Sequence, residues 1–228
     1  MSVPAYFIAG TDTEIGKTTL SSVIICALAK RGLKTAAMKP VAAGTVLVDG
    51  VPHNEDVDAL MAASNMALPQ ETVCPFLLNT PISPNLSAEE DGVTIEIEKI
   101  VETFKTIRSQ SDAVIVEGVG GFIVPFTETV SSADLAVALG LPVILVVGLR
   151  LGCISHALLT AEAIRARGLT VAGWIANRVD PTMAFSDGNI TTLEKWLGAP
   201  RLGTMPNLQS FDGAEQYLDL SLLPDLKA

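Results

Sequence analysis

Short apolar runs alternate with segments of helical periodicity along this chain. The apolar runs predict buried strands at 6–9, 35–39, 113–117, 142–147, 171–176 and 202–205. Helices are expected at 17–31, 56–63, 94–110, 154–167, around Leu193, and from Ser131 or Ser132 to Leu139. Strands that alternate with helices predict an α/β fold with a doubly wound, mostly parallel sheet, whose ligands bind at the carboxyl ends of the strands.

Two segments lack a clear period. Residues 41–55 predict a loop, and residues 69–92, which contain Pro69, Pro75, Pro81 and Pro84, predict an irregular excursion. Long irregular segments within a compact domain are often functional. The sequence shows no internal repeat and no low-complexity linker, so we expect a single domain over residues 1–228.

The composition narrows the class of protein. Of the 228 residues, 49% are hydrophobic and 18% are charged, which fits either a large subunit interface or simply a well-filled core. The net charge of −10 argues against a nucleic-acid partner. Two histidines argue against a zinc site. Three cysteines without Cys-x-x-Cys spacing, no leader pattern and no membrane-span pattern lead us to expect a cytoplasmic protein.

The segment after the first predicted strand has the layout of a phosphate-binding P-loop. Gly10 and Gly16 bound a loop that opens a helix, with five residues between them instead of the usual four. In such a loop Lys17 would reach the β and γ phosphates, and the Thr18 hydroxyl would ligate Mg²⁺. Glu14 is unexpected there, because a carboxylate repels phosphate.

Other predicted strands also end in polar groups. Lys39 ends the second strand, Glu117 ends the third, and Asn177 follows the fifth. These side chains would respectively neutralise phosphoryl charge, complete a Mg²⁺ site and meet an adenine edge, although each also fits a solvated strand end or turn. Asp56 and Asp58 begin a short helix, where they could cap it or serve the metal.

One further loop could bind an anion. Residues 151–155 lead into a helix whose free N–H groups could hold a substrate carboxylate, or could form a plain loop-to-helix junction. The adjacent Ser155 and His156 point to different faces of a helix, which argues against a nucleophile–base pair.

Taken together, these motifs resemble the dethiobiotin synthetase family over almost the whole chain. The matching segments are 10–18, 39–41, 116–118, 120–121, 142–148, 151–153, 173–174 and 176–177, and the five-residue gap in the P-loop is a feature of that family. The resemblance implies a homodimeric, Mg²⁺-dependent ligase of the P-loop NTPase type. Its substrates would be ATP, CO₂ or bicarbonate, and 7,8-diaminononanoate.

The resemblance also assigns roles to residues. The reacting groups would meet Thr13, Glu14, Lys17 and Lys39, and the metal would meet Thr18, Asp56 and Glu117. The nucleotide would contact Glu14, Ile15, Gly16, Lys17, Thr18, Thr19, Asp56, Glu117, Gly118, Gly120, Asn177, Pro206, Asn207 and Leu208. The diamine would contact Ala43, Thr45 and Gly120, and its carboxylate would contact Gly152, Cys153 and Ile154 across the dimer interface.

Three positions depart from the family pattern: Ala43 replaces Ser or Thr, Asn85 replaces a common His, and Arg150 replaces Lys. They bear on substrate affinity more than on the reaction. The main alternative is a ParA/MinD-like dimerising switch ATPase, whose loop usually carries an additional lysine where this chain has Thr11 or Asp12. A cobyric acid synthase relative would need a further domain, and a non-enzymatic nucleotide-binding module would not need two lysines and two carboxylates at one site.

Overall fold

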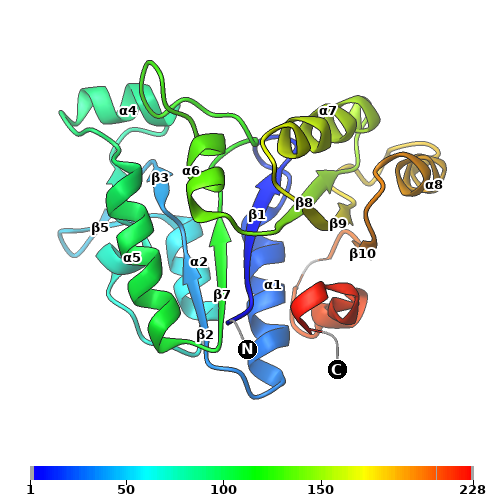
Figure 1. Ribbon diagram of the computed structural model, residues 1–228, viewed down its shortest axis with the longest axis horizontal. Helices are drawn as coiled ribbons and strands as arrows, with labels where there is room; N and C mark the ends of the chain where they lie inside the picture. Colours follow the sequence, from blue (N-terminus) through cyan, green and yellow to red (C-terminus); the bar gives the residue numbers. More distant parts are fainter. Residues whose placement is uncertain (1–2, 209, 227–228) are drawn as a thin grey trace.

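The centre of the structure is a six-stranded parallel sheet (Figure 1). The computed structural model describes residues 3–208 and 210–226. The strands are β1 (Ala5–Gly10), β2 (Thr35–Met38), β7 (Ala113–Glu117), β8 (Val143–Gly148), β9 (Val171–Asn177) and β10 (Arg201–Met205). They lie in the order β10-β9-β8-β1-β7-β2, which confirms the predicted doubly wound α/β fold.

Side chains that alternate along the strands belong to two separate hydrophobic cores, one on each face of the sheet. Tyr6 and Ile8 of β1 pack against α1 (Lys17–Lys30) and α2 (Glu55–Ala63) on one face. Phe7 and Ala9 face the opposite core. That core is covered by α5 (Ile97–Gln110), α6 (Ser132–Leu139), α7 (Cys153–Ala166) and α8 (Ser186–Trp196) (Figure 1). Both faces of the sheet are therefore buried, as the apolar strands require.

The segment 41–55 is not the predicted loop. It contains β3 (Val41–Ala43), β4 (Val46–Val48) and β5 (Val51–His53). Strands β4 and β5 form an antiparallel hairpin, whose two turn residues Asp49 and Gly50 have positive φ angles of 51° and 80°. Asp-Gly between apolar residues is a strong local signal for a hairpin, and it does not depend on any longer period.

The proline-rich segment 69–92 is also more regular than predicted. It contains α3 (Gln70–Val73), β6 (Phe76–Leu78) and α4 (Pro84–Glu90). Strand β6 pairs in parallel with β3, so that Val41 lies opposite Phe76. Two of the prolines lie at helix starts. Pro69 is the N-cap of α3, and Pro84 is the first residue of α4, where a proline is well tolerated.

The start of α5 and the cap of α2 differ from the prediction, whereas the cap of α6 is one of the two residues predicted. Helix α5 begins at Ile97, three residues after the expected start, and its buried side chains are Ile100, Phe104 and Ile107. Ser131 caps α6 and forms a capping box with Asp134. The N-cap of α2 is Asn54, not Asp56 or Asp58.

The chain ends in three short 3₁₀ helices, η1 (Ala214–Tyr217), η2 (Leu220–Leu222) and η3 (Pro224–Leu226). Residues of the first two belong to the same core as α1. In the part of the chain that the structure describes, no helix is both long and apolar enough to cross a lipid bilayer.

A substitution at Gly203 tests how closely this terminal segment packs on the sheet. A Cβ at Gly203 in β10 would lie 2.0 Å from the backbone carbonyl oxygen of Tyr217. Gly203→Ala should therefore lower the free energy of unfolding by about 1–3 kcal/mol or more in urea titrations. Gly188→Ala is the matched control: it lies in α8, where an added Cβ would approach no atom closer than Phe185 Cβ at 4.0 Å, and it should be neutral or stabilising by up to about 1 kcal/mol. Equal effects of the two changes would contradict the packing described.

Candidate active site

The register of the central strands places Lys39 beside Glu117. Met38 of β2 lies opposite Val116 of β7, so the residues that follow emerge next to each other at the carboxyl edge of the sheet. Lys39 Nζ donates to Glu117 Oε1 at 2.6 Å and to Asp56 Oδ2 at 2.8 Å. The lysine thus bridges two carboxylates that come from different elements.

Asp56 is held in place by the cap of α2. The Asn54 side chain accepts from the backbone N–H of Asp56 at 3.1 Å, while its amide donates to the Gly44 carbonyl at 2.7 Å. Thr18, in the first turn of α1, faces the same carboxylates. Its Oγ1 lies 2.6 Å from Asp56 Oδ1 and 2.8 Å from Glu117 Oε1. A hydroxyl has one proton, so it can donate fully to only one of them at a time.

Two of the three charged side chains in this network are shielded from solvent. The side chains of Lys39 and Glu117 are 3% and 0% exposed, whereas that of Asp56 is 39% exposed. Burial by itself lowers the pKa of Lys39, but Glu117 and Asp56 outweigh it and leave the pKa raised. Burial raises the pKa of Asp56, and Lys39 outweighs that effect, so its pKa ends below its usual range. Lys39 and Asp56 are therefore both held in their charged forms.

The P-loop has the backbone geometry that its glycines suggest. Gly16 has a φ of 82°, and Glu14, which is not a glycine, has a φ of 56°. Lys17 folds back so that its Nζ donates to the Asp12 carbonyl at 2.9 Å. Burial, and then the nearby charge of Lys39, lower the pKa of Lys17 to about 8. Lys17 thus lines the cleft, and no carboxylate of the described residues lies within hydrogen-bond distance of it.

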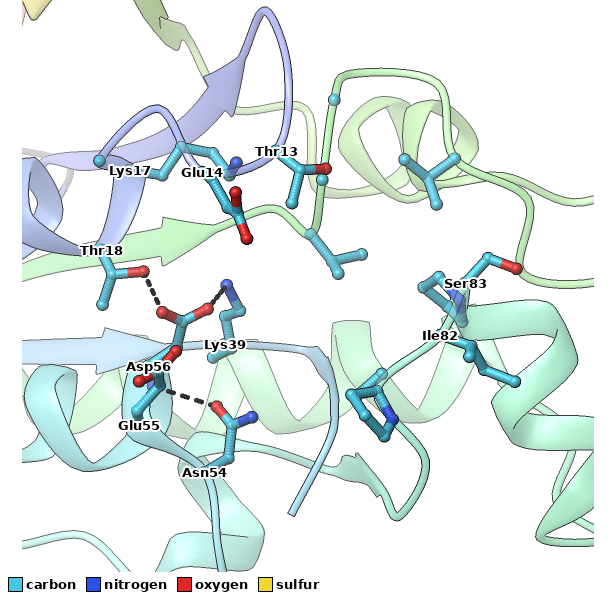
Figure 2. Close-up of a pocket in the computed structure, with 18 residues that line it drawn as sticks. Thr13, Glu14, Lys17, Thr18, Lys39, Asn54, Glu55, Asp56, Ile82 and Ser83 are labelled. Atoms are coloured by element: carbon cyan, nitrogen blue, oxygen red, sulfur yellow. Dashed lines mark hydrogen bonds and ion pairs between the residues drawn. The ribbon is translucent and has the colours of Figure 1, made fainter. Parts of the chain in front are cut away.

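A cleft of about 580 Å³ opens beside this network, as Figure 2 shows. One part of its lining is polar and the other is apolar, so it can accept both phosphate oxygens and an aliphatic chain. From the predicted residues the cleft gathers Thr13, Glu14, Gly16, Lys17, Thr18, Lys39, Ala43, Asp56 and Gly120. Glu117 lies buried below Lys39.

Other predicted residues do not line the cleft: Ile15, Thr19, Thr45, Gly118, Gly152, Cys153, Ile154, Asn177, Pro206, Asn207 and Leu208. Thr19 lines a separate hollow between α1 and the C-terminal segment. Asn177 supports the backbone of the P-loop, since its side-chain amide donates to the Ile15 carbonyl at 2.8 Å. Cys153 is only 1% exposed, so its thiol does not face solvent.

Half of the residues that line the cleft were not predicted from the sequence: Asn54, Glu55, Pro81, Ile82, Ser83, Pro84, Val119, Gly121 and Val124. Four of these residues lie in the proline-rich segment 69–92, whose length and irregular pattern already suggested a functional role. Asn54 could have been found as an N-cap, because an Asn directly before an acidic first turn is a helix-start signal.

The donor set of Thr18, Asp56 and Glu117 fits a magnesium ion. Mg²⁺ prefers oxygen ligands and is usually held by one or two carboxylates together with phosphate oxygens. Glu117 Oε2 is buried and has no hydrogen-bond partner among the described residues, so this carboxylate has unused coordinating capacity. Within residues 3–208 and 210–226, no group of three or more His, Cys, Asp or Glu side chains forms a site built from protein alone.

Known proteins resemble this chain both in sequence and in fold. A family model described as an AAA domain (AAA_26) matches residues 4–215. The chain is 55% identical to the ATP-dependent dethiobiotin synthetase BioD of Ralstonia nicotianae, a match that covers 95% of this chain and 96% of that protein. The septum site-determining protein MinD of Pyrococcus horikoshii, solved with Mg-ADP, has a TM-score of 0.58 at 18% identity and covers 96% of this chain and 87% of its own. A ParA family ATPase of Chlorobium tepidum has a TM-score of 0.58 at 13% identity, covering 96% and 92%.

The fold and the strand-end site define a P-loop nucleotide-binding protein with an AAA domain. The likeness to MinD and ParA, at 18% identity or less, shows the fold alone. The match to the curated relative goes further, because more than half of the residues are identical over almost the full length of both proteins. The chain belongs to the ATP-dependent dethiobiotin synthetase family.

A double-substitution series tests the buried ion pair. Lys39→Met should lower the free energy of unfolding by about 3–5 kcal/mol, because it leaves the Glu117 carboxylate buried without its charge partner. Lys39→Met/Glu117→Gln removes both charges and should recover at least half of that loss. Urea titrations measure the free energy of unfolding of the wild type and of both variants. Lys105→Met, on the exposed face of α5, is the control. A double variant less stable than Lys39→Met would contradict this account.

Proposed function

We propose that this protein is an ATP- and Mg²⁺-dependent ligase that closes the ureido ring of dethiobiotin. Its substrates are 7,8-diaminononanoate, CO₂ and ATP, and its products are dethiobiotin, ADP and phosphate. The observation that carries the proposal is the meeting of Lys17, Thr18, Lys39 and Asp56 in one cleft that also has an apolar part. The identity of 55% to a dethiobiotin synthetase supports the same reaction.

The reaction takes place in three steps. One amine of the substrate adds to CO₂ and loses a proton, giving a carbamate. A carbamate oxygen then attacks the γ-phosphorus of ATP and expels ADP, which forms a mixed carbamic–phosphoric anhydride. Finally the second amine attacks the carbamoyl carbon, phosphate leaves and the ring closes. Phosphoryl transfer of this kind depends on positioning and charge neutralisation more than on an acid–base pair.

The residues of the site suit that demand. Lys17 would exchange its bond to the Asp12 carbonyl for the β and γ phosphates, and Lys39 would neutralise the carbamate and the transferred phosphoryl group. Thr13 and Glu14 would lie beside the reacting groups at the rim of the cleft. Thr18, Asp56 and Glu117 would hold Mg²⁺, which when bound neutralises charge on the phosphate oxygens.

The nucleotide site extends along the P-loop. Its backbone, together with Thr19, Gly118 and Gly120, would hold the phosphates. Asn177 and residues 206–208 would hold the adenine. The side-chain oxygen of Asn177 accepts no hydrogen bond from any residue that the structure describes, and only the side-chain nitrogen is used to support Ile15, so this oxygen would serve the adenine.

The diamine would lie along the apolar part of the cleft, which contains Ala43, Pro81, Ile82 and Val124. Thr45 lies just beyond Ala43 and would supply the hydroxyl that Ala43 lacks. Gly152–Ile154 do not line the cleft of their own chain, so we place the substrate carboxylate on these residues of a second subunit in a homodimer. Three apolar side chains near α7 support such an interface: Leu151, Leu159 and Phe185 are 95%, 62% and 88% exposed.

Two further properties belong to the proposal. An ATP-consuming reaction fits the cytoplasm, and Cys26, Cys74 and Cys153 are free thiols, as expected in a reducing compartment. We expect small-molecule substrates and no nucleic-acid partner, because the net charge of −10 would repel a phosphate backbone. One functional unit over residues 1–228 agrees with the family match to residues 4–215.

The switch-ATPase alternative has less support. It rests on a fold shared at 18% identity or less, whereas the ligase assignment rests on 55% identity. The positions that would carry the additional lysine of a switch ATPase hold Thr11 and Asp12, and Asp12 pairs with Arg150.

An omission assay tests the proposed reaction. Purified protein is mixed with ATP, Mg²⁺, bicarbonate and 7,8-diaminononanoate, and dethiobiotin is detected by mass together with ADP. Product should appear only when all four are present. Lys17→Ala and Lys39→Ala should each lower kcat by about 100-fold or more, since each removes a group that neutralises transition-state charge. Lys105→Ala should leave the rate unchanged. Equal ADP release without the diamine, and no dethiobiotin, would refute the ligase and favour the switch ATPase.

A charged substitution on α7 tests the homodimer. Leu159→Asp should turn a dimer into a monomer in sedimentation experiments, because a carboxylate would be buried in an apolar contact. It should also raise KM for the diamine at least tenfold while nucleotide binding is retained. Leu222→Asp, at another partly exposed leucine in η2, should change neither quantity. A dimeric Leu159→Asp variant with an unchanged KM would rule out this interface.

A further inference from the structure

The ammonium of Lys39 and the proposed metal ion need the same two carboxylates, those of Asp56 and Glu117. Glu117 Oε1 accepts from both Lys39 Nζ at 2.6 Å and Thr18 Oγ1 at 2.8 Å. Asp56 is shared in the same way, with Oδ2 toward Lys39 and Oδ1 toward Thr18. Figure 2 shows Lys39 and Thr18 on either side of the Asp56 carboxylate. Both carboxylates are thus already in contact with a cation, and they share the single proton of the Thr18 hydroxyl.

A cation is required here even when no metal is bound. Glu117 is completely buried, and a buried carboxylate without a charge partner is costly. Two carboxylates that face the same hydroxyl also repel each other. Lys39 removes both problems, because its side chain is 3% exposed and contacts the two carboxylates at once.

A divalent ion bound by Thr18, Asp56 and Glu117 would change these contacts. The Thr18 oxygen can ligate a metal only when its proton points away from the ion. The ammonium and the metal are like charges, so their contacts with one set of carboxylates weaken each other. The Lys39 side chain can then turn toward the cleft, because it already lines the cleft. Its Nζ also lies 3.4 Å from another acceptor, the Gly118 carbonyl oxygen.

We propose that Lys39 is a placeholder for the divalent cation: it holds Asp56 and Glu117 together until the metal arrives, and metal binding then releases it toward the reacting groups in the cleft. The inference rests on the magnesium site of the proposed function. It implies that Lys39 weakens metal binding, although the reaction depends on it. Loss of this lysine should therefore make the metal bind more tightly and the enzyme work less.

Titration of the full-length protein with Mn²⁺ alone, followed by the electron paramagnetic resonance signal of the free ion, tests this inference. Lys39→Met should bind Mn²⁺ at least tenfold more tightly than the wild type. Lys105→Met, on the exposed face of α5, is the control for loss of a lysine charge; its affinity should change no more than about threefold. Lys39→Met/Glu117→Gln, which also removes a ligand charge, should lose the gain.

Thermal unfolding gives a second readout. Mg²⁺ should raise the Tm of Lys39→Met more than that of the wild type, because it restores the missing positive charge. If Lys39→Met does not fold, Lys39→Gln takes its place, since it keeps an amide donor for Glu117.

Two results would overturn the inference. The first leaves the proposed metal site intact, and the second refutes that site as well. If the wild type binds Mn²⁺ and the Lys39 variant binds it equally or more weakly, the placeholder is wrong and the metal site stands. If no variant binds Mn²⁺ or Mg²⁺, with or without ADP, the proposed metal site fails as well.

Discussion

The charge of Glu117 is the constraint on which the rest of the site depends. A carboxylate that ends a central parallel strand has no access to water, so a cation must stand beside it. The sheet meets this requirement through strand order: β2 lies next to β7, and the residue after β2 is Lys39. Asp56 and Thr18 then complete the network from two helices. The pairing of two strands therefore also arranges the chemical groups of the cleft.

Local charge explains how an acidic chain can bind an anionic nucleotide. The net charge of −10 is spread over the molecule, and exposed charges beyond about 10 Å are screened at moderate ionic strength. Within the cleft, Lys17 and Lys39 are nearly buried, and their charges are screened less. The free N–H groups at the start of α1 add to them. The field that a phosphate meets is thus set by a few nearby groups, and the overall composition has little influence on it.

The sequence predicted the features that are local or lie at strand ends. The P-loop, the six central strands and the positions of Lys39 and Glu117 follow from short apolar runs and the residues just after them. The hairpin β4–β5 was missed because its strands have three residues each, too few to show a period. The cleft wall at 81–84 was missed because it depends on how β6 and α4 pack against β3, and no local pattern encodes that contact.

The support that Asn177 gives to the P-loop has a consequence for protein engineering. A Cβ on Gly16 would lie 2.3 Å from the Asn177 amide nitrogen, so the loop and the end of β9 fit together with no spare room. The shape of the loop is therefore a joint property of two segments that are about 160 residues apart in the chain. A designer who transplanted residues 10–19 into another scaffold would need to bring this strand end along, or the loop would lose the template that shapes it.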